Sequence, residues 1–424
     1  MEPIRPVKGT RDFFPEDMSF RQWLYAKTRE ASERFGYQEY DGPFLERMDL
    51  YAAKSGEELV KDQSFVFEDR GGELVALRPE LTPSLARMVA SKSKALPRPI
   101  RWWSFGPFWR YERPQRGRSR EFFQWNIDLL GIDSPEADAE IVAAGAEFLR
   151  GVGLSSDAVR ILVNDRRLAE SQLDELGIGA DRRALVFKLI DRRDRMPAEK
   201  WADWSLGEGL NKQELESLQK LLDNREAWKN SRPLQRFFEA TEALGVADYV
   251  AYDPTVIRGL DYYTGIVFEA RDSEAKFRAI FGGGRYDDLV SAVGGDRVPG
   301  TGFAMGDMVI RLVLEQYDAA PQLRSRPSEI LITTFDEGSL TATLALAVDF
   351  RAAGIPAEWY PVPDKLAKQL KYAVRVGARV AVILGPDEIA AGTVTVRDLV
   401  SGEQQSVSRD QAAALAKELV EREI

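Results

Sequence analysis

The stretch PFWRYERPQRGRSREFFQWNIDLLG, residues 107–131, decides the fold class of this chain. Two runs rich in aromatic and apolar residues flank a basic loop, in which five arginines lie between Arg110 and Arg120. Pro114 and Gly117 in that loop are typical of a turn. The pattern predicts two strands within 101–131 that pair as an antiparallel hairpin.

Polar residues recur at every second position of this hairpin. Because strand side chains alternate between two faces, Arg110 and Glu112 point to one side, and Gln124, Asn126 and Asp128 share one side of the return strand. The hairpin therefore offers a guanidinium, carboxylates and amides to one pocket, and arginine binds phosphate through two parallel hydrogen bonds. The alternative is a solvated hairpin with ion pairs along one face.

The composition narrows the possible chemistry. The 424 residues include 58 Lys and Arg, 68 Asp and Glu, and neither cysteine nor histidine, so the net charge is −10. Disulfides, zinc–thiolate sites, cysteine nucleophiles and imidazole bases are thereby excluded. No apolar run reaches the ~18 residues of a membrane span. The first residues are unlike a secretory signal, so we expect a cytoplasmic protein without membrane contact.

The chain length predicts two or three domains. Residues 1–320 form the expected core, interrupted at about 166–245 by a charged, leucine-rich helical insertion. A linker at 321–328 contains proline and small polar residues. Strands then alternate with helices over 329–424, which predicts a separate α/β domain with a largely parallel sheet.

Three further stretches carry residues suited to a site. IRGLDYYTGIVFEA (257–270) places an arginine and two tyrosines at a glycine-bounded bend, and the alternative is a turn followed by core aromatics. The glycines of FGGGRYDDLV (281–290) let backbone approach a ligand, or mark a bulge. LRPELTPSLAR (77–87) places Glu80 and Thr82 at a helix start, and the alternative is that Thr82 only caps the helix.

Together these stretches resemble the histidyl-tRNA synthetases, a family of class II aminoacyl-tRNA synthetases, nearly from end to end. RGLDYYTG with GGGRYDDLV is similar to the histidine-specific signature pair of that family. FWRYERPQRGR resembles class II motif 2, and YDGPFLE resembles motif 1 with its dimer-interface proline. KLAKQLKYAVRVGARVAVILG is similar to the family's anticodon-binding domain.

The resemblance implies the fold and the reaction. It implies an α+β catalytic domain with an antiparallel sheet of six or seven strands and a helical insertion, followed by a C-terminal α/β anticodon-binding-like domain. It also implies a homodimer that activates L-histidine with ATP, accompanied by Mg²⁺, and transfers the histidyl group to the 3′ end of tRNA(His). A non-charging, histidine-binding regulatory protein is the alternative function.

The resemblance also implies roles by position. Arg110 and Arg258 would act at the reacting carboxylate and α-phosphate. ATP would be bound by Arg110, Glu112 and Arg311, and the acceptor stem by Arg113, Gln115, Arg116 and Arg118. Histidine would be bound by Glu80, Leu81, Thr82, Gln124, Asp128, Tyr262, Tyr263 and Tyr286. No resident metal ion is implied.

Two positions depart from the family pattern. Val309 lies where motif 3 usually carries the arginine that packs on ATP, and Arg311 is two residues further on. Phe123 lies where the family usually has histidine, and with the missing Cys and His it motivates the hypothesis of a reduced-alphabet sequence. A natural close homologue that also lacks every histidine would argue against deliberate removal.

Overall fold

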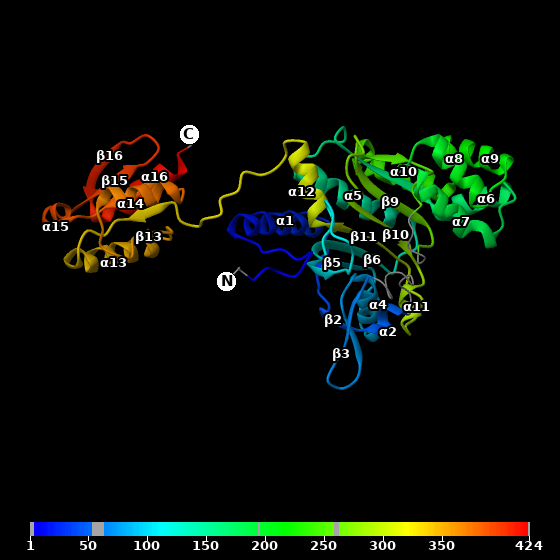
Figure 1. Cartoon of the computed structure of the whole chain (residues 1–424), viewed down its shortest axis with the longest axis horizontal. Coiled ribbons are helices and arrows are strands. Elements are labelled where there is room, and N and C mark those ends of the chain that lie inside the picture. Colours follow the sequence, from blue (N-terminus) through cyan, green and yellow to red (C-terminus); the bar gives the residue numbers. More distant parts are fainter. Residues whose placement is uncertain (1–3, 53–62, 194–195, 258–262, 423–424) are drawn as a thin grey trace. The chain divides into compact units, whose positions relative to one another are not determined.

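The structure is a computed structural model that describes residues 4–52, 63–193, 196–257 and 263–422. Its contacts divide the chain into two compact units, Met1–Gln322 and Leu323–Ile424 (Figure 1). Each unit has its own apolar core. No helix in the described part of the chain is both long and apolar enough to cross a membrane.

The first unit is built on one eight-stranded sheet in the order β1-β5-β6-β11-β10-β9-β7-β8. Six inner strands run antiparallel, as predicted, while β1 and β8 add parallel edges, which the expected antiparallel sheet does not include. The strands span Gln38–Glu39 (β1), Ile100–Trp109 (β5), Glu121–Leu130 (β6), Val159–Asp165 (β7), Val250–Tyr252 (β8), Ile266–Asp272 (β9), Phe281–Tyr286 (β10) and Gly300–Gly306 (β11).

The sheet has one apolar face and one polar face. On β6, Trp125, Ile127 and Leu129 are buried in the main core, which also includes residues of α1 (Pro15–Arg34) and α5 (Pro135–Gly151). The Trp125 ring lies 5.2 Å from Phe148 of α5, and its Nε1 donates to Ser32 of α1 at 3.0 Å. The intervening residues of β6 therefore face the other way, toward the site.

The helical insertion forms a small core of its own. Helices α6 (Arg166–Glu175), α7 (Ala180–Asp191), α8 (Ala198–Gly207) and α9 (Lys212–Asp223) pack around residues such as Leu189, Trp201 and Leu218 (Figure 1). After η2 (Ala227–Asn230), α10 (Arg232–Ala243) packs instead on α5, with Phe237 in the main core, and η3 (Ala247–Tyr249) leads into β8. The independent part of the insertion is thus shorter than the predicted 166–245.

Smaller elements surround the polar face. A three-stranded antiparallel sheet consists of β2 (Leu45–Arg47), β4 (Leu74–Leu77) and β3 (Phe65–Glu68), and the helices there are α2 (Met48–Ala52), α4 (Thr82–Ser91), α11 (Leu289–Ala292) and α12 (Asp307–Gln316). Helix α4 packs against both α2 and α11. Residues from 77 to 91 and from 286 to 298 meet in one apolar cluster beside the sheet.

The second unit has a mixed five-stranded sheet in the order β13-β12-β14-β15-β16, with β13, β12 and β14 parallel. β15 and β16 run antiparallel, so the predicted largely parallel sheet is only half right. Residues 384–392 connect β14 to β15. This connection is shorter than the dozen or so residues that a crossover between parallel strands needs, so β15 runs antiparallel to β14. The strands are Ile330–Ile332 (β12), Glu358–Trp359 (β13), Val380–Ile383 (β14), Thr393–Asp398 (β15) and Gln404–Ser408 (β16); the helices are Glu337–Ala352 (α13), Leu366–Arg375 (α14), Pro386–Ala391 (α15) and Arg409–Glu421 (α16).

Candidate active site

The floor of the candidate site is the polar face of β6. Gln124, Asn126 and Asp128 lie opposite Gly306, Ala304 and Gly302 of β11, and opposite Gly106, Ser104 and Trp102 of β5. Directly opposed residues point to the same face of a sheet. With the exception of Trp102, small residues therefore flank the polar stripe, and we call this strip of the sheet face, from Gln124 to Asp128, the trench.

Glycine is required on this face at two positions beside Asp128. A Cβ on Gly302 would lie 2.3 Å from Asp128 Oδ1 and 2.6 Å from the Ile127 carbonyl oxygen. A Cβ on Gly300 would lie 2.6 Å from the ring of Tyr286. Any larger residue would displace the pair formed by Asp128 and Tyr286.

Asp128 is a buried carboxyl group at one end of the trench. Tyr286 donates a short hydrogen bond to its Oδ1, and burial raises the pKa of Asp128 to about 7 in spite of that bond. Tyr40, Trp102, Tyr263 and Tyr286 belong to the apolar cluster beside it. A polar group with four aromatic neighbours suits a flat ligand ring that carries hydrogen-bonding atoms.

A pocket of about 490 Å³, open to solvent, lies at the other end of the trench, and its lining includes Arg110, Glu112, Gln124 and Asp307. Arg110 Nε donates to the Pro79 carbonyl at 2.9 Å, and its guanidinium lies 5.4 Å from the Phe122 ring centre. Gln124 thus belongs both to the pocket lining and to the polar stripe.

The segment 77–87 lies against the same hairpin. Arg78 is fully buried and donates from Nε to the Pro107 carbonyl at 2.9 Å. Glu80 and Leu81 are buried, and Thr82 begins α4. The N-cap residue of α4 is Leu81, and no side chain caps this helix, so Thr82 does not have the capping role of the alternative reading.

The basic loop is a tight turn. Gln115 and Arg118 exchange backbone hydrogen bonds of 3.0 and 2.9 Å, and Gly117 has φ +75°, as the third residue of a type II turn requires. Arg113, Gln115 and Arg116 are exposed. The Arg116 guanidinium lies 5.5 Å from the ring centre of Phe277. Arg118 instead pairs with the buried carboxylate of Glu112, so of the four residues predicted to meet an acceptor stem, the other three are the exposed ones.

Helix α12 presents Val309, and not Arg311, to the pocket. Arg311 pairs with Asp17 of α1 at 2.9 Å and with Glu315 at 3.3 Å. Two residues along a helix turn a side chain by about 200°, so the two positions cannot face the same way. The structure therefore does not bring Arg311 to the ATP contact predicted for it.

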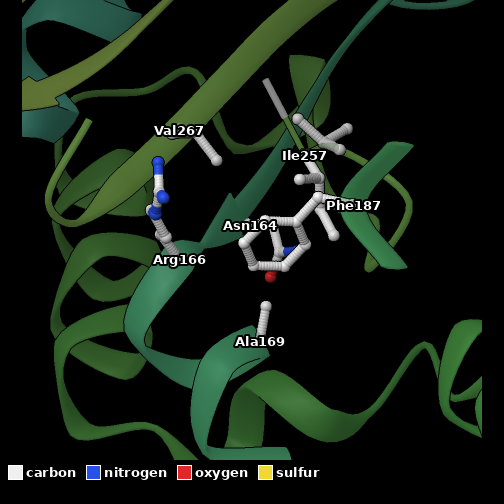
Figure 2. Close-up of a pocket in the computed structure, with 7 residues that line it drawn as sticks. Asn164, Arg166, Ala169, Phe187, Ile257 and Val267 are labelled. Carbon is white, nitrogen blue, oxygen red and sulfur yellow. The ribbon is translucent and has the colours of Figure 1, made fainter. Parts of the chain in front are cut away.

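Arg258 and Tyr262 lie outside the described residues, but the residues on either side of them are described. Ile257 lines a hollow of about 250 Å³ with Asn164, Arg166 and Phe187, between the sheet and the insertion (Figure 2). Asn164 Nδ2 donates to the Pro254 carbonyl at 3.2 Å. Tyr263 is buried within the cluster beside Asp128. Of the described residues on either side, Ile257 therefore lies at this hollow and Tyr263 lies at the aromatic end of the trench.

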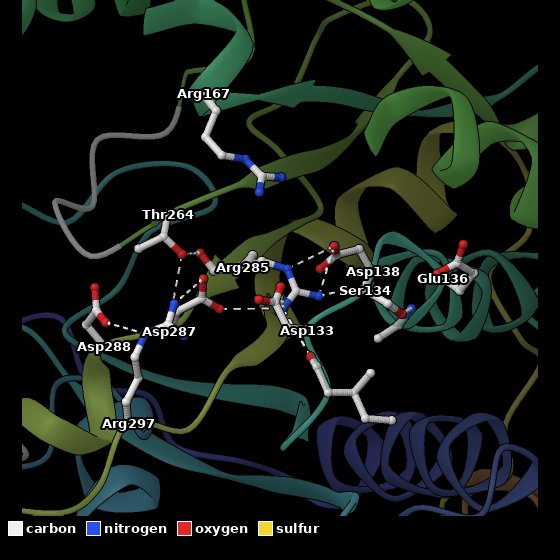
Figure 3. A network of polar contacts seen from close by, with 12 residues as sticks. Asp133, Ser134, Glu136, Asp138, Arg167, Thr264, Arg285, Asp287, Asp288 and Arg297 are labelled. Carbon is white, nitrogen blue, oxygen red and sulfur yellow. Dashed lines mark hydrogen bonds and ion pairs between the residues drawn. The ribbon is translucent and has the colours of Figure 1, made fainter. Parts of the chain in front are cut away.

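A structural role for Arg285 was missed by the sequence analysis. Figure 3 shows its fully buried guanidinium among Asp138 at 3.0 Å, the Ser134 carbonyl at 2.8 Å and Asp287 at 3.5 Å. Burial raises the pKa of Asp138 to about 6, and the carboxylate beside Arg285 is ionised at neutral pH. Because Arg285 precedes Tyr286 on β10, it points to the opposite face, where it fixes the start of α5.

The comparisons with known proteins agree with this arrangement. The family model described as "Histidyl-tRNA synthetase" matches residues 9–308, well over half of the chain, and the one described as "Anticodon binding domain" matches residues 329–419. The chain belongs to the histidyl-tRNA synthetase family. The model boundaries leave out 309–328, which contains the predicted linker.

Relatives extend over nearly the whole chain. A chloroplastic/mitochondrial histidine–tRNA ligase of Arabidopsis thaliana is 39% identical over 95% of this chain and 85% of its own length. The histidine–tRNA ligase of Pyrococcus horikoshii is 37% identical over 99% of this chain and 100% of its own length. The crystal structure of the Nostoc sp. PCC 7120 histidyl-tRNA synthetase superposes with a TM-score of 0.82 at 23% identity, covering 99% of each chain, which supports the fold.

The position at which this synthetase departs from its family's usual histidine is filled by a packed ring. Phe123 stacks on Phe105 at 6.0 Å, meets Phe13 edge-on at 5.7 Å, and has the Arg21 guanidinium 4.6 Å from its centre. Its backbone N–H donates to Asp307 at 3.0 Å. Phe123 therefore ties the N-terminal segment and α12 to β6, and its ring has no titrating group.

Replacing Asp128 by Asn tests the burial of this carboxyl group. A folded-state pKa of about 7, above the ordinary carboxyl value, means that the folded protein retains a proton which the unfolded chain releases. The free energy of unfolding therefore falls as the pH rises from about 4 to 7. Asp128→Asn keeps an acceptor for Tyr286 and should stabilise the protein at pH 8 by roughly 2–4 kcal/mol. Denaturant unfolding at pH 5 and pH 8 measures this, and an equal gain at both values contradicts it.

Arg110 and Arg311 should differ sharply in their effect on ATP affinity. Arg110→Ala removes a guanidinium from the pocket and should raise the Kd for ATP by about 10–100-fold, the range of a hydrogen bond to a charged group. Arg311→Ala serves as the matched control and should change the Kd by less than about twofold, since its contacts are with Asp17, Glu315 and the Phe20 ring and not with the pocket. Titration calorimetry measures both values. Equal losses would place Arg311 in the nucleotide site.

Proposed function

We propose that this chain is a histidine–tRNA ligase whose two small substrates meet along β6. The observation that carries the proposal is the trench itself, which joins the buried Asp128 to the pocket lined by Arg110 and Glu112. The family membership and the named activity of its relatives supply the reaction.

Histidine recognition follows from the chemistry of imidazole. With a pKa near 6.5 the free ring is mostly neutral at pH 7, with one N–H donor and one acceptor nitrogen. Asp128 would accept from the N–H, and Tyr263 and Tyr286 would line the ring, with Tyr262 beside them. Glu80, Leu81, Thr82 and Gln124 would surround the α-amino group. A site built from buried polar partners rejects analogues without those groups by about 10⁴–10⁵-fold, so separate editing is unnecessary.

Activation needs no protein base. The substrate carboxylate is already ionised; one of its oxygens attacks the α-phosphorus of ATP, the bond to the β-phosphate oxygen breaks, and diphosphate leaves. Arg110 and Arg258 would neutralise the negative charge that builds up on the phosphate, and Glu112 would lie near the adenine. This chemistry is compatible with a chain that has no histidine.

Mg²⁺ would arrive with ATP, bound to its phosphate oxygens, and add positive charge there. Among the described residues, no three Asp or Glu side chains come together as a metal site. The cation would therefore depend mainly on the nucleotide for its ligands.

The exposed part of the basic turn would bind the acceptor stem. Arg113, Gln115 and Arg116 project from the hairpin that carries Arg110, and Arg118 would add charge from its pair with Glu112. The 329–424 domain would bind the anticodon, and 1–320 would carry catalysis, joined to it by 321–328. The enzyme would work in the cytoplasm, where we expect its tRNA.

A second copy of the chain would cover the small sheet of β2, β4 and β3. On one of its faces Leu45 and Phe67 are 49% and 46% exposed, and Phe44 beside β2 is 46% exposed. Such a cluster of large apolar side chains in water is typical of an interface. The adjoining YDGPFLE stretch is the one that resembles the family's dimer motif.

A regulatory protein that binds histidine without charging tRNA is the second candidate. Val309 in place of the motif 3 arginine favours it. The match of residues 329–419 to an anticodon-binding domain opposes it, because regulation of another enzyme by histidine does not require that domain.

Histidine-dependent exchange between ATP and labelled diphosphate decides between the two. The wild-type chain should catalyse exchange in the presence of Mg²⁺, and Arg258→Ala should lower its rate at least 100-fold without changing the melting temperature. Lys200→Ala, an exposed change within the insertion, is the control and should leave the rate unaltered. Histidine binding without exchange by the wild-type chain would establish the regulatory function.

A negative charge on the small sheet should dissociate the proposed dimer. Phe67→Asp places a carboxylate on the exposed apolar face and should convert the protein to a monomer at micromolar concentration, as seen by analytical ultracentrifugation. Val374→Asp is a matched change at an exposed apolar residue of the second unit and should leave the dimer intact. A monomeric wild-type protein would refute the proposal.

A further inference from the structure

The middle residue of the polar stripe has an unused hydrogen-bond donor. Asn126 is 4% exposed, and its Nδ2 has no hydrogen-bond partner among the residues that the structure describes. It lies on β6 between Gln124 and Asp128, with Ser104 opposite on β5 and Ala304 opposite on β11. Neither of these neighbours has a side chain larger than that of serine.

A buried donor without a partner destabilises a fold, because it has lost its hydrogen bonds to water and gained none in return. The same sheet contains a buried asparagine without this penalty, because Asn164 donates to the Pro254 carbonyl at 3.2 Å and accepts from the Asp165 N–H at 2.8 Å. The contrast indicates that the Asn126 amide is kept for a partner that is absent from the chain itself. That partner must present a hydrogen-bond acceptor in the trench.

The spacing along β6 matches one aromatic ring. Successive residues on the same face of a strand are about 7 Å apart. A five-membered ring with a hydrogen bond of about 2.9 Å on either side spans roughly the same distance, so one ring can reach both Asn126 and Asp128. Neutral imidazole is such a ring, since it carries a donor nitrogen and an acceptor nitrogen, and Asp128 supplies the acceptor for its N–H.

We propose that Asn126 is a specificity-determining residue that donates its amide N–H to the unprotonated ring nitrogen of bound histidine. The inference rests on the proposed placement of histidine over β6. Asp128 accepts from the ring N–H at the far end, Nε2, and Asn126, which lies closer to Gln124 and the amino-acid head group, meets Nδ1. The pair thereby selects one neutral tautomer.

The tyrosines then act mainly as walls of the pocket. The Tyr263 ring lies 3.0 Å from the position of a Cβ on Gly284, and Tyr286 holds one oxygen of Asp128. Asn126 therefore supplies the donor side of ring recognition, for which Tyr263 was the sequence-based candidate. A ring methylated at Nδ1 would clash with the amide, and a ring methylated at Nε2 would clash with Asp128.

Exchange kinetics with histidine and its two ring-methylated forms test the proposal. Asn126→Ala should raise the KM for histidine about 10–30-fold, with kcat within threefold and the KM for ATP unchanged. It should also raise the relative rate with Nδ1-methylhistidine at least tenfold, because the space of the amide is vacated. Rejection of Nε2-methylhistidine should persist, since Asp128 is intact.

Asn126→Asp replaces the donor by an acceptor at almost constant shape and should weaken histidine binding more than Asn126→Ala does. It also decides the question should the alanine variant fail to fold. Asn164→Ala is the matched control, which should lower the melting temperature without changing the ratio of rates among the three amino acids. Wild-type exchange with histidine, combined with unchanged KM and analogue ratios in both Asn126 variants, would overturn the proposal and leave the ligase function standing.

Discussion

The rest of the site depends on one constraint, which is that the strand beside Asp128 can carry no side chain at the adjacent position. β6 lies in the middle of the sheet, and its apolar face is fixed in the core by Trp125, Ile127 and Leu129. Its other face can be polar only if the neighbouring strands leave space, and Gly302 does so, since a Cβ there would lie 2.3 Å from the Asp128 carboxylate. A slip of one residue would exchange the two faces, so the register of the core sets the register of the site.

This arrangement places buried polar groups that destabilise the fold at the positions where substrates would bind. Asp128 is buried with a pKa near 7, and the amide of Asn126 and one oxygen of Glu112 have no partner within the described residues. Each lies along the proposed path from histidine to ATP. The opposite face contains a comparable buried charge, Arg285, which is surrounded by carboxylates and carbonyls. The guanidinium of Arg285 is thus satisfied by its neighbours, whereas Asn126 and Glu112 each keep one polar atom available for a substrate, as differential binding requires.

Alternation along 121–130 was sufficient to predict the shared face of Gln124, Asn126 and Asp128. The strand alternation predicted for Arg110 and Glu112 was wrong, because β5 ends at Trp109, although both residues line the pocket. Arg285 was missed because its neighbours in the sequence suggested a ligand loop, and only the β10 pairing shows which way it points. Arg311 was misplaced because two positions on a helix look adjacent in sequence. The parallel direction of the edge strands β1 and β8 could not be predicted, nor could the antiparallel direction of β15 and β16. A short strand segment does not show which strand it pairs with or in which direction.

The substitution of Val309 for an arginine has a physical consequence at the rim of the pocket. A Cβ on Gly117, at the tip of the basic turn, would lie 3.6 Å from Val309 and 3.7 Å from Leu312, so the turn rests on an apolar surface of α12. An arginine at 309 would bring a charge to that contact. In this chain the arginines that line the pocket, Arg110 and Arg118, both come from the hairpin. The charge of Arg118 is balanced by its ion pair with Glu112. A displacement of the turn would therefore change both the cover and the charge of the pocket, and in the proposed enzyme it would affect the nucleotide site and the tRNA-binding loop together.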